Sequence, residues 1–288
     1  MMRPDKAFIR RILGRPWLGS VALFVLFIAV WHVLTATSAT DVSAVDPEYA
    51  RLAGQSAAAQ PTAAIPTPGA VARRGAELLL HAFDRSNPNN IGIAWHLLQS
   101  LGRVLLGFAL ALVIAVPLGF ALGLFPYVYQ ALNPFIQVLR PISPLAWMPL
   151  ALYAFRDSNV SAIFIIFICA LWPMLINTAV GAANVRQEWV NVSRVFGLPT
   201  LQHVALIMFP ASVPMIMTGM RISIGVAWFV IVAAEMVGAQ SGIGYFIWNE
   251  WNNLQLASMI VAIVLIGLVG LGLDSALASM ARRLTFRE

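Results

Sequence analysis

The stretch 184-NVRQEWVNVSRVFGLPTLQHVALIMFP-210 lies between two long apolar segments and decides how the chain is organised. Polar residues at helical spacing run to Arg194, and a glycine at 197, a second helical segment and a proline at 210 follow. Glycine readily takes the left-handed conformation that ends a helix, and proline does not continue one. The pattern predicts a compact elbow outside the membrane, made of two short helices that transmit a push.

The composition around this elbow is that of a membrane protein. Of 288 residues, 60% are hydrophobic and 10% are charged, and the mean hydropathy is +0.80. Soluble domains of this size do not reach such values, so most of the chain is expected to lie in lipid.

Six segments are long and apolar enough to cross hydrocarbon about 30 Å thick, which takes about 20 helical residues. They are residues 17–36, 100–124, 134–155, 159–180, 211–237 and 256–278. A cleaved signal peptide is the alternative for the first segment, but its apolar run is long for one. The predicted fold is an all-α integral membrane domain with six spans.

The basic residues predict the orientation and the domain boundaries. They cluster in a head, residues 1–16, and a tail, residues 279–288. Because such residues stay on the cytoplasmic side, both termini and the elbow are predicted to be cytoplasmic, in a bacterial inner membrane. Residues 37–95 then form a partly mobile outside (periplasmic) insertion with a short helix near 71–83. A five-span core follows at 96–278.

Two features of the core call for special packing. Polar residues at intervals in 91–106 predict an amphipathic helix at the outer interface that runs into the second span. The third span contains four prolines, which break backbone hydrogen bonds that lipid cannot replace. We expect it to pack inside the bundle or to line a wet cavity, with tolerated kinks as the alternative.

Several chemistries are excluded by what the sequence lacks. Lys6 is the only lysine and has no glycine-rich run before it, so the chain has no P-loop for ATP. The arginines are spread along the chain, which does not favour nucleic acid. Cys169 is alone in an apolar run and is expected in the core, and the histidines are far apart, so a metal site is not expected. The acids Asp157, Glu235 and Asp274 are expected to be isolated, so we expect no enzyme.

Residues 191–210 resemble the signature loop of the permease subunits of binding-protein-dependent ABC importers. That loop reads Glu-Ala-Ala, three residues, Gly, nine residues, Ile, one residue, Leu-Pro. This chain has Asn191-Val192-Ser193, Gly197, Ile207, Phe209 and Pro210 at those positions without a gap. The glutamate is replaced, and Glu188 is the candidate substitute. The resemblance implies a coupling helix seated in a separate ATP-binding subunit, with these coupling residues: Glu188, Asn191, Val192, Ser193, Arg194, Gly197, Leu198, Ile207 and Pro210.

The resemblance extends over residues 91–278 and points to the nitrate, bicarbonate, sulfonate and taurine branch. It is carried by 97-LLQSLGRV-104, 137-QVLRPISPLAWMP-149, 219-GMRISIG-225 and 233-AAEM-236, while the outside insertion and residues 242–253 look more like the nitrate and bicarbonate members.

This resemblance implies a type I importer permease that binds no cofactor itself. Its partners would be a second copy, two cytoplasmic subunits that bind ATP and Mg, and a periplasmic solute-binding protein. The implied cargo is a small anion, nitrate or nitrite first, with bicarbonate, cyanate, sulfonate or taurine as alternatives. A secondary transporter or channel without an ATPase is the rival class, although we find no inverted repeats.

Charges within the spans are expected to pair with another helix or to border water, because a charge at membrane depth costs several kcal/mol. Arg140 and Arg221 are the charged residues expected deepest within the predicted spans. A guanidinium can donate two parallel hydrogen bonds to a planar oxyanion. We expect a substrate pathway lined by Arg140, Trp147, Arg221, Trp228 and Glu235. The alternative is that these side chains only pack or join helices.

Overall fold

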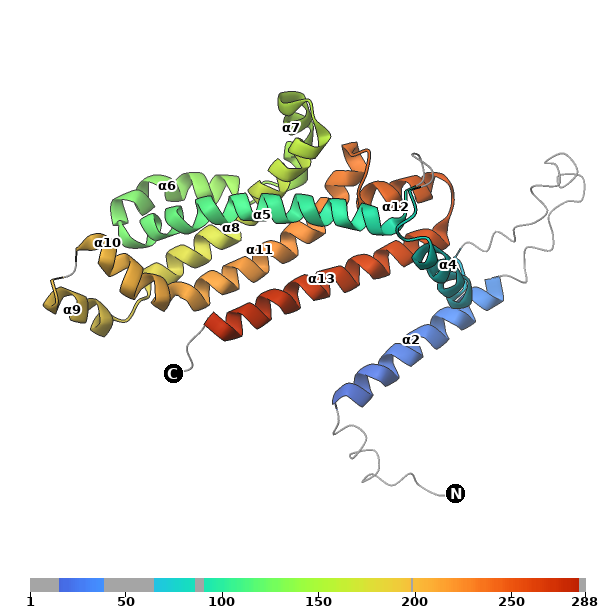
Figure 1. Cartoon of the computed structure of the whole chain (residues 1–288), viewed down its shortest axis with the longest axis horizontal. Helices are drawn as coiled ribbons and strands as arrows, with labels where there is room; N and C mark the ends of the chain where they lie inside the picture. Colours follow the sequence, from blue (N-terminus) through green and yellow to red (C-terminus); the bar gives the residue numbers. More distant parts are fainter. Residues whose placement is uncertain (1–15, 39–64, 86–90, 198, 285–288) are drawn as a thin grey trace, which may run out of the picture. The chain divides into compact units, whose positions relative to one another are not determined.

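The computed structural model describes residues 16–38, 65–85, 91–197 and 199–284, and every regular element in them is helical (Figure 1). These residues divide into two compact units. The first holds α2 (Pro16–Ser38), α4 (Pro68–Leu80) and residues 254–261, and the second holds the described parts of 81–253 and 262–288. The expected head, most of the outside insertion and the end of the tail lie outside the described residues.

Five of the described helices are long and apolar enough to cross a membrane. They are α2, α5 (Ile93–Leu124), α8 (Ser158–Ala183), α11 (Phe209–Gly238) and α13 (Leu256–Leu284). They match five of the six predicted spans. The shorter elements are α6 (Pro126–Leu139), η2 (Pro144–Trp147), α7 (Met148–Phe155), α9 (Gln187–Val195), α10 (Thr200–His203), η3 (Val204–Met208) and α12 (Ile243–Asn252).

The third predicted span, residues 134–155, is a bent pair of helices, which accounts for a sixth crossing where the pair forms one span. That region forms α6 and the η2–α7 segment, which are bent by 87° relative to each other. Pro144 and Pro149 each lie in the first two positions of a new helix, where a missing N–H costs nothing. The expectation that this span packs inside the bundle holds for α7, which buries Met148 and Ala151, whereas α6 buries none of its residues in the single chain.

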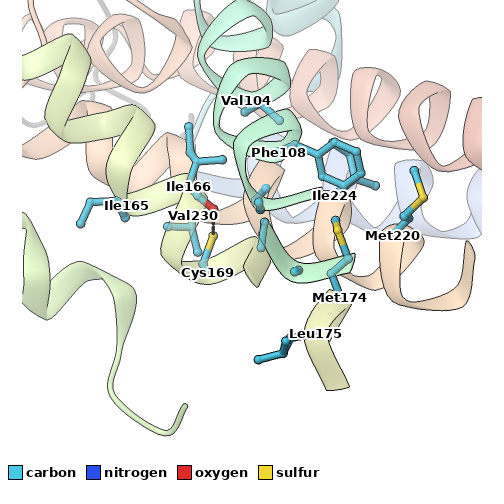
Figure 2. Close-up of a cluster of buried hydrophobic side chains, with 14 of the residues drawn as sticks. Val104, Phe108, Ile165, Ile166, Cys169, Met174, Leu175, Met220, Ile224 and Val230 are labelled. Atoms are coloured by element: carbon cyan, nitrogen blue, oxygen red, sulfur yellow. Dashed lines mark hydrogen bonds between the residues drawn. The ribbon is translucent and has the colours of Figure 1, made fainter. Parts of the chain in front are cut away.

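The core of the second unit is the layer where α5, α8 and α11 meet. Figure 2 shows Val104 and Phe108 of α5, Ile166 and Met174 of α8 and Ile224 of α11 converging in it. α5 carries a small residue every fourth position at this contact, and such stripes let helix backbones approach closely. The stripe consists of Gly107, Ala111, Ala115, Gly119 and Gly123. Cys169 is buried in the same core, as predicted.

The polar residues at the start of α5 point inward, not toward an outer interface. α5 is continuous, as predicted, but His96, Ser100 and Arg103 are all buried. The Arg103 guanidinium pairs with Glu235 of α11, with 2.5 Å between Nη1 and Oε1, and it also donates to Asn159 and to Ser241. The amphipathic surface helix predicted for 91–106 is therefore wrong, because a buried carboxylate attracts these groups inward.

The same cluster holds the first turn of α12. The backbone N–H of Gly242 donates to Nδ1 of His96, that of Ile243 to Oγ of Ser100, and that of Gly244 to Oε2 of Glu235. These are the N–H groups that a helix leaves without partners at its N-terminus. Gly242 has φ of 113°, and a Cβ there would collide with the Glu235 carboxylate, so the turn requires glycine.

The first unit contains a surface helix bonded to the start of α13. Nε of Arg74 in α4 donates to Oγ of Ser258 at 2.9 Å, and Nη1 of Arg74 pairs with Glu77 at 3.1 Å. The short helix expected near 71–83 is thus confirmed, with its bounds shifted toward the N-terminus.

Two glycines of α11 test the close packing of the core. A Cβ on Gly219 would lie 2.8 Å from Cβ of Asn177, whereas within the described residues a Cβ on Gly225 meets nothing within 4 Å. An alanine methyl at an open helical position gains about 0.5–1 kcal/mol, but forcing one into a packed interface costs about 1–3 kcal/mol. We expect G219A to lower the melting temperature of the purified protein in detergent and G225A to keep or raise it. Equal melting curves would contradict the packing.

The buried ion pair provides a second test of what holds the helices together. Glu235→Gln leaves the Arg103 guanidinium without a counter-charge, and removing one partner of a buried pair costs about 3–5 kcal/mol. Glu77→Gln breaks an exposed pair, which is worth about 0–1 kcal/mol. In thermal unfolding we expect E235Q to melt well below the wild type and E77Q to match it.

A double variant, R103M/E235M, serves as the control for that test. It removes both charges together and is expected to recover part of the loss of E235Q. If E235Q melts like the wild type, the cluster does not hold α5, α11 and α12.

Candidate functional site

The elbow predicted from the sequence forms a projection at one end of the second unit, and α12 lies toward the other end (Figure 1). It consists of α9, a turn at Gly197 with φ of 61°, and α10. This φ is left-handed, which explains why glycine ends the first helix. Val195 and Phe196 beside the turn are 86% and 75% exposed. Apolar side chains this exposed outside the apolar spans indicate a docking surface.

The expectation that Pro210 ends the second elbow helix is wrong. The chain continues from α10 through the π-helical turn η3 into α11, and Pro210 lies in the first turn of α11. In η3 the N–H of Phe209 bonds to the carbonyl of Val204, and proline at the next position has no N–H to satisfy. The elbow is therefore continuous with a membrane-spanning helix, and such wide turns are frequent at functional sites.

The other coupling residues are placed as follows. Glu188 and Asn191 are exposed on α9, and Oδ1 of Asn191 accepts from Nε2 of Gln187 at 3.3 Å. Ile207 is half-buried in η3. Leu198 and the side chains of Val192, Ser193 and Arg194 lie outside the described residues.

An open cavity of about 810 Å³ lies between α6 and the ends of α5 and α8. Arg140 caps α6 at its rim, and Asn184, three residues before α9, caps α8 on the other side. Within the described part of the chain, the Arg140 guanidinium has no carboxylate partner. The polar lining comprises Tyr129, Asn133, Gln137, Arg140 and Asn184, and the remainder is apolar. The cavity thus combines an available positive charge, amide groups and a direct connection to the elbow.

The remaining pathway candidates do not line this cavity. Trp147 is half-buried against the core at the end of η2. Trp228 is buried and donates from Nε1 to the carbonyl of Ile266 at 2.9 Å. Arg221 pairs with Asp274 of α13, and Glu235 belongs to the buried cluster with Arg103.

Sequence reasoning missed several of these partnerships. The expectation that the three acids are isolated is wrong: Glu235 and Asp274 are in ion pairs, and Asp157 accepts from the N–H of Val160 as the N-cap of α8. The expectation that a charge within the spans finds a partner on another helix is confirmed for Glu235 and Arg221. The spacing of His96, Ser100 and Arg103 along one helical face was the available signal for the cluster.

The sequence matches a known family over most of its length. Residues 96–286 match the family described as binding-protein-dependent transport system inner membrane component. Among similar proteins, the nitrate import permease protein NrtB of Leptolyngbya laminosa is 38% identical over 96% of this chain and 90% of its own length. NrtB of Synechocystis sp. is 45% identical over 74% and 78%. The bicarbonate transport system permease protein CmpB of Synechococcus elongatus is 41% identical over 73% and 76%.

The fold matches a solved importer at low sequence identity. A chain of the MetNI methionine ABC transporter, in an inward-facing conformation, superposes with a TM-score of 0.60 and 17% identity. The match covers 70% of this chain and 100% of that chain. It supports a type I importer transmembrane fold and says nothing of cargo.

The long apolar helices, the elbow between α8 and α11 and the family match over residues 96–286 together identify the chain. It belongs to the binding-protein-dependent transport system inner membrane component family, and it is a non-catalytic, multi-pass permease subunit of an ABC importer, whose ATPase and binding protein are separate partners.

Proposed function

We propose that this permease carries a small planar oxyanion, nitrate first, from a periplasmic solute-binding protein into the cytoplasm. The observation that carries the proposal is the Arg140 cavity, because its guanidinium faces open space beside the helix that leads into the elbow. A free guanidinium offers paired N–H donors in the planar arrangement that nitrate accepts. The similarity to nitrate import permeases supports this cargo. Bicarbonate is the second candidate, because it is also planar and bicarbonate permeases are among the relatives.

The orientation follows from the charges at the two ends of the second unit. Arg186 precedes α9, and Arg282 and Arg283 end α13 on the elbow side (Figure 1). Residues 243–252, which form α12, contain no lysine or arginine. Since basic residues stay in the cytoplasm, we place the elbow and both termini inside and α12 and the 37–95 insertion in the periplasm.

The elbow is the proposed contact with the ATPase. Two ATP-binding subunits, holding ATP and Mg, would each receive one elbow from two copies of this permease. Val195 and Phe196 are its exposed apolar anchors, and Glu188 and Asn191 lie on the same short helix. Closure of the ATP-binding subunits would move the elbow and, through η3, the α11 helix.

The two ends of the unit suit alternating access. At the α12 end, α5, α11 and α12 are joined by the Arg103–Glu235 cluster and would move as one body. At the elbow end, η3 borders an apolar hollow of about 780 Å³ against α5, which leaves room for the elbow to tilt. Rigid-body rocking around a membrane-embedded path is the general form of such transport.

The docking proposal is tested at Phe196. F196D places a charge on the exposed anchor, and losing a central apolar anchor typically costs about 2 kcal/mol of binding, roughly a 30-fold weaker Kd. Leu254 is also exposed (82%) but lies next to α12, so L254D is the matched control. In a titration of the purified permease with its ATP-binding subunit, we expect weaker binding for F196D alone. Wild-type affinity of F196D would contradict the elbow as the contact.

The cargo proposal is tested at Arg140. In proteoliposomes with the assembled importer and its binding protein, we expect nitrate uptake by the wild type. R140Q should reduce it about tenfold or more, since a charge-assisted hydrogen-bonded pair is worth about 1.5–3 kcal/mol. R140K keeps the charge without the fork and should retain more uptake than R140Q. Parallel assays with bicarbonate, cyanate and taurine identify the cargo, and unchanged uptake in R140Q with normal assembly would remove Arg140 from the path.

A further inference from the structure

A second arginine, Arg221 of α11, is held by a carboxylate in a geometry that a planar anion would share. Its Nε donates to Oδ1 of Asp274 at 3.0 Å, and its Nη2 donates to Oδ2 at 2.9 Å. This is the two-pronged arrangement in which a guanidinium binds two oxygens in one plane. Nitrate and bicarbonate present the same edge, two oxygens on one trigonal centre. The Asp274 carboxylate therefore occupies the place that such an anion would take.

The pair lies within the membrane-spanning part of both helices. In the predicted span 256–278, Asp274 lies four residues, about 6 Å, inside the C-terminal end and thus within the hydrocarbon layer. In the single chain the two side chains are 44% and 49% exposed. A half-exposed ion pair at this depth is costly against lipid tails. Its open side must therefore face water or another protein chain, as on a path between two permease copies.

The other intramembrane pair, Arg103 and Glu235, differs in exposure and in its hydrogen-bond partners. Arg103 and Glu235 are 8% and 0% exposed, and Asn159 and Ser241 occupy the remaining donors of that guanidinium. An external anion has no room there. At Arg221 the Asp274 carboxylate is the partner of both bonding nitrogens, and both side chains are about half exposed in the single chain.

A second hydrogen bond joins α13 to α11 besides this pair. Trp228, two turns along α11 from Arg221, donates to the carbonyl of Ile266. Ile266, Val269 and Leu273 of α13 pack against the apolar core. Rotation of the Asp274 side chain away from Arg221 would leave the Trp228–Ile266 bond in place.

We propose that Asp274 is a tethered competitor for the transported anion on Arg221. This rests on the proposed function, that the cargo is a small planar oxyanion. An arriving anion takes the two donors of Arg221 and displaces the carboxylate, and the carboxylate expels the anion when it returns. The site is thus neutral when empty. Its apparent affinity is the intrinsic affinity multiplied by the fraction of molecules in which Asp274 has left Arg221. A low-affinity step of this kind favours release.

The experiment measures nitrate binding to the permease–ATPase complex without its binding protein. Sodium nitrate is titrated by calorimetry into the wild type, D274N, D274S, D274E and the double variant R221Q/D274N. D274N and D274S remove the competing charge and are expected to bind nitrate about tenfold tighter than the wild type. D274E re-forms the pair and should bind nitrate as weakly as the wild type. R221Q/D274N lacks the Arg221 guanidinium and should bind nitrate no more tightly than the wild type. E77Q, in the exposed pair of α4, is the control and should leave nitrate affinity unchanged.

The outcomes separate this inference from the proposed function. If D274N and D274S form intact complexes, lose melting temperature and bind nitrate no tighter than the wild type, the pair is only a brace and the inference fails. If the wild type still takes up nitrate when these variants bind it no tighter, nitrate remains the proposed cargo although Asp274 does not compete with it. If D274N binds nitrate tightly through Arg221 but the wild-type importer takes up no nitrate, the anion site stands and the assigned cargo falls.

Discussion

The buried pair of Arg103 and Glu235 is the interaction on which the rest of the second unit depends. Neither charge is tolerable alone in an apolar layer, so α5 and α11 are held in one register by the need to neutralise them. Once they meet, the cluster supplies acceptors to the first turn of α12 and donors to Asn159 and Ser241. Four segments distant in sequence are thereby fixed around one carboxylate.

This constraint explains why the two ends of the unit differ. The α12 end is dense in mutual hydrogen bonds, and its glycines leave no space for a larger residue beside Glu235. The elbow end has a π-helical turn, two open cavities and exposed apolar side chains. The proposed lever is at the second kind of end, and the segment proposed to move as one body is at the first. Arg140 and Asn184 line the same cavity, which places the proposed anion path next to the elbow.

The spans and the elbow were predictable because their signals are local. Long apolar runs mark helices that cross hydrocarbon, and the glycine at 197 marks a left-handed helix end whatever surrounds it. The angle of the bend in the third span was not predictable, because apolar composition over 134–155 does not report direction. Four prolines there indicated a break, but only the packing of α6 beside α5 and of α7 beside α8 decided a bend of 87°. Pro210 was mispredicted because a proline that ends one helix and a proline that starts another look alike in a sequence.

The sequence by itself determined that this chain is a membrane-spanning permease with an elbow between two spans, since composition, span length and the motif at 191–210 are properties of contiguous residues. It also required partners for the intramembrane charges, because the cost of an unpaired charge in lipid does not depend on the fold. Which charges pair was decided only by the tertiary structure: Arg103 meets Glu235 across 132 positions and Arg221 meets Asp274 across 53. Ion pairs form between groups that are close in space, and closeness at these separations depends on how the helices pack.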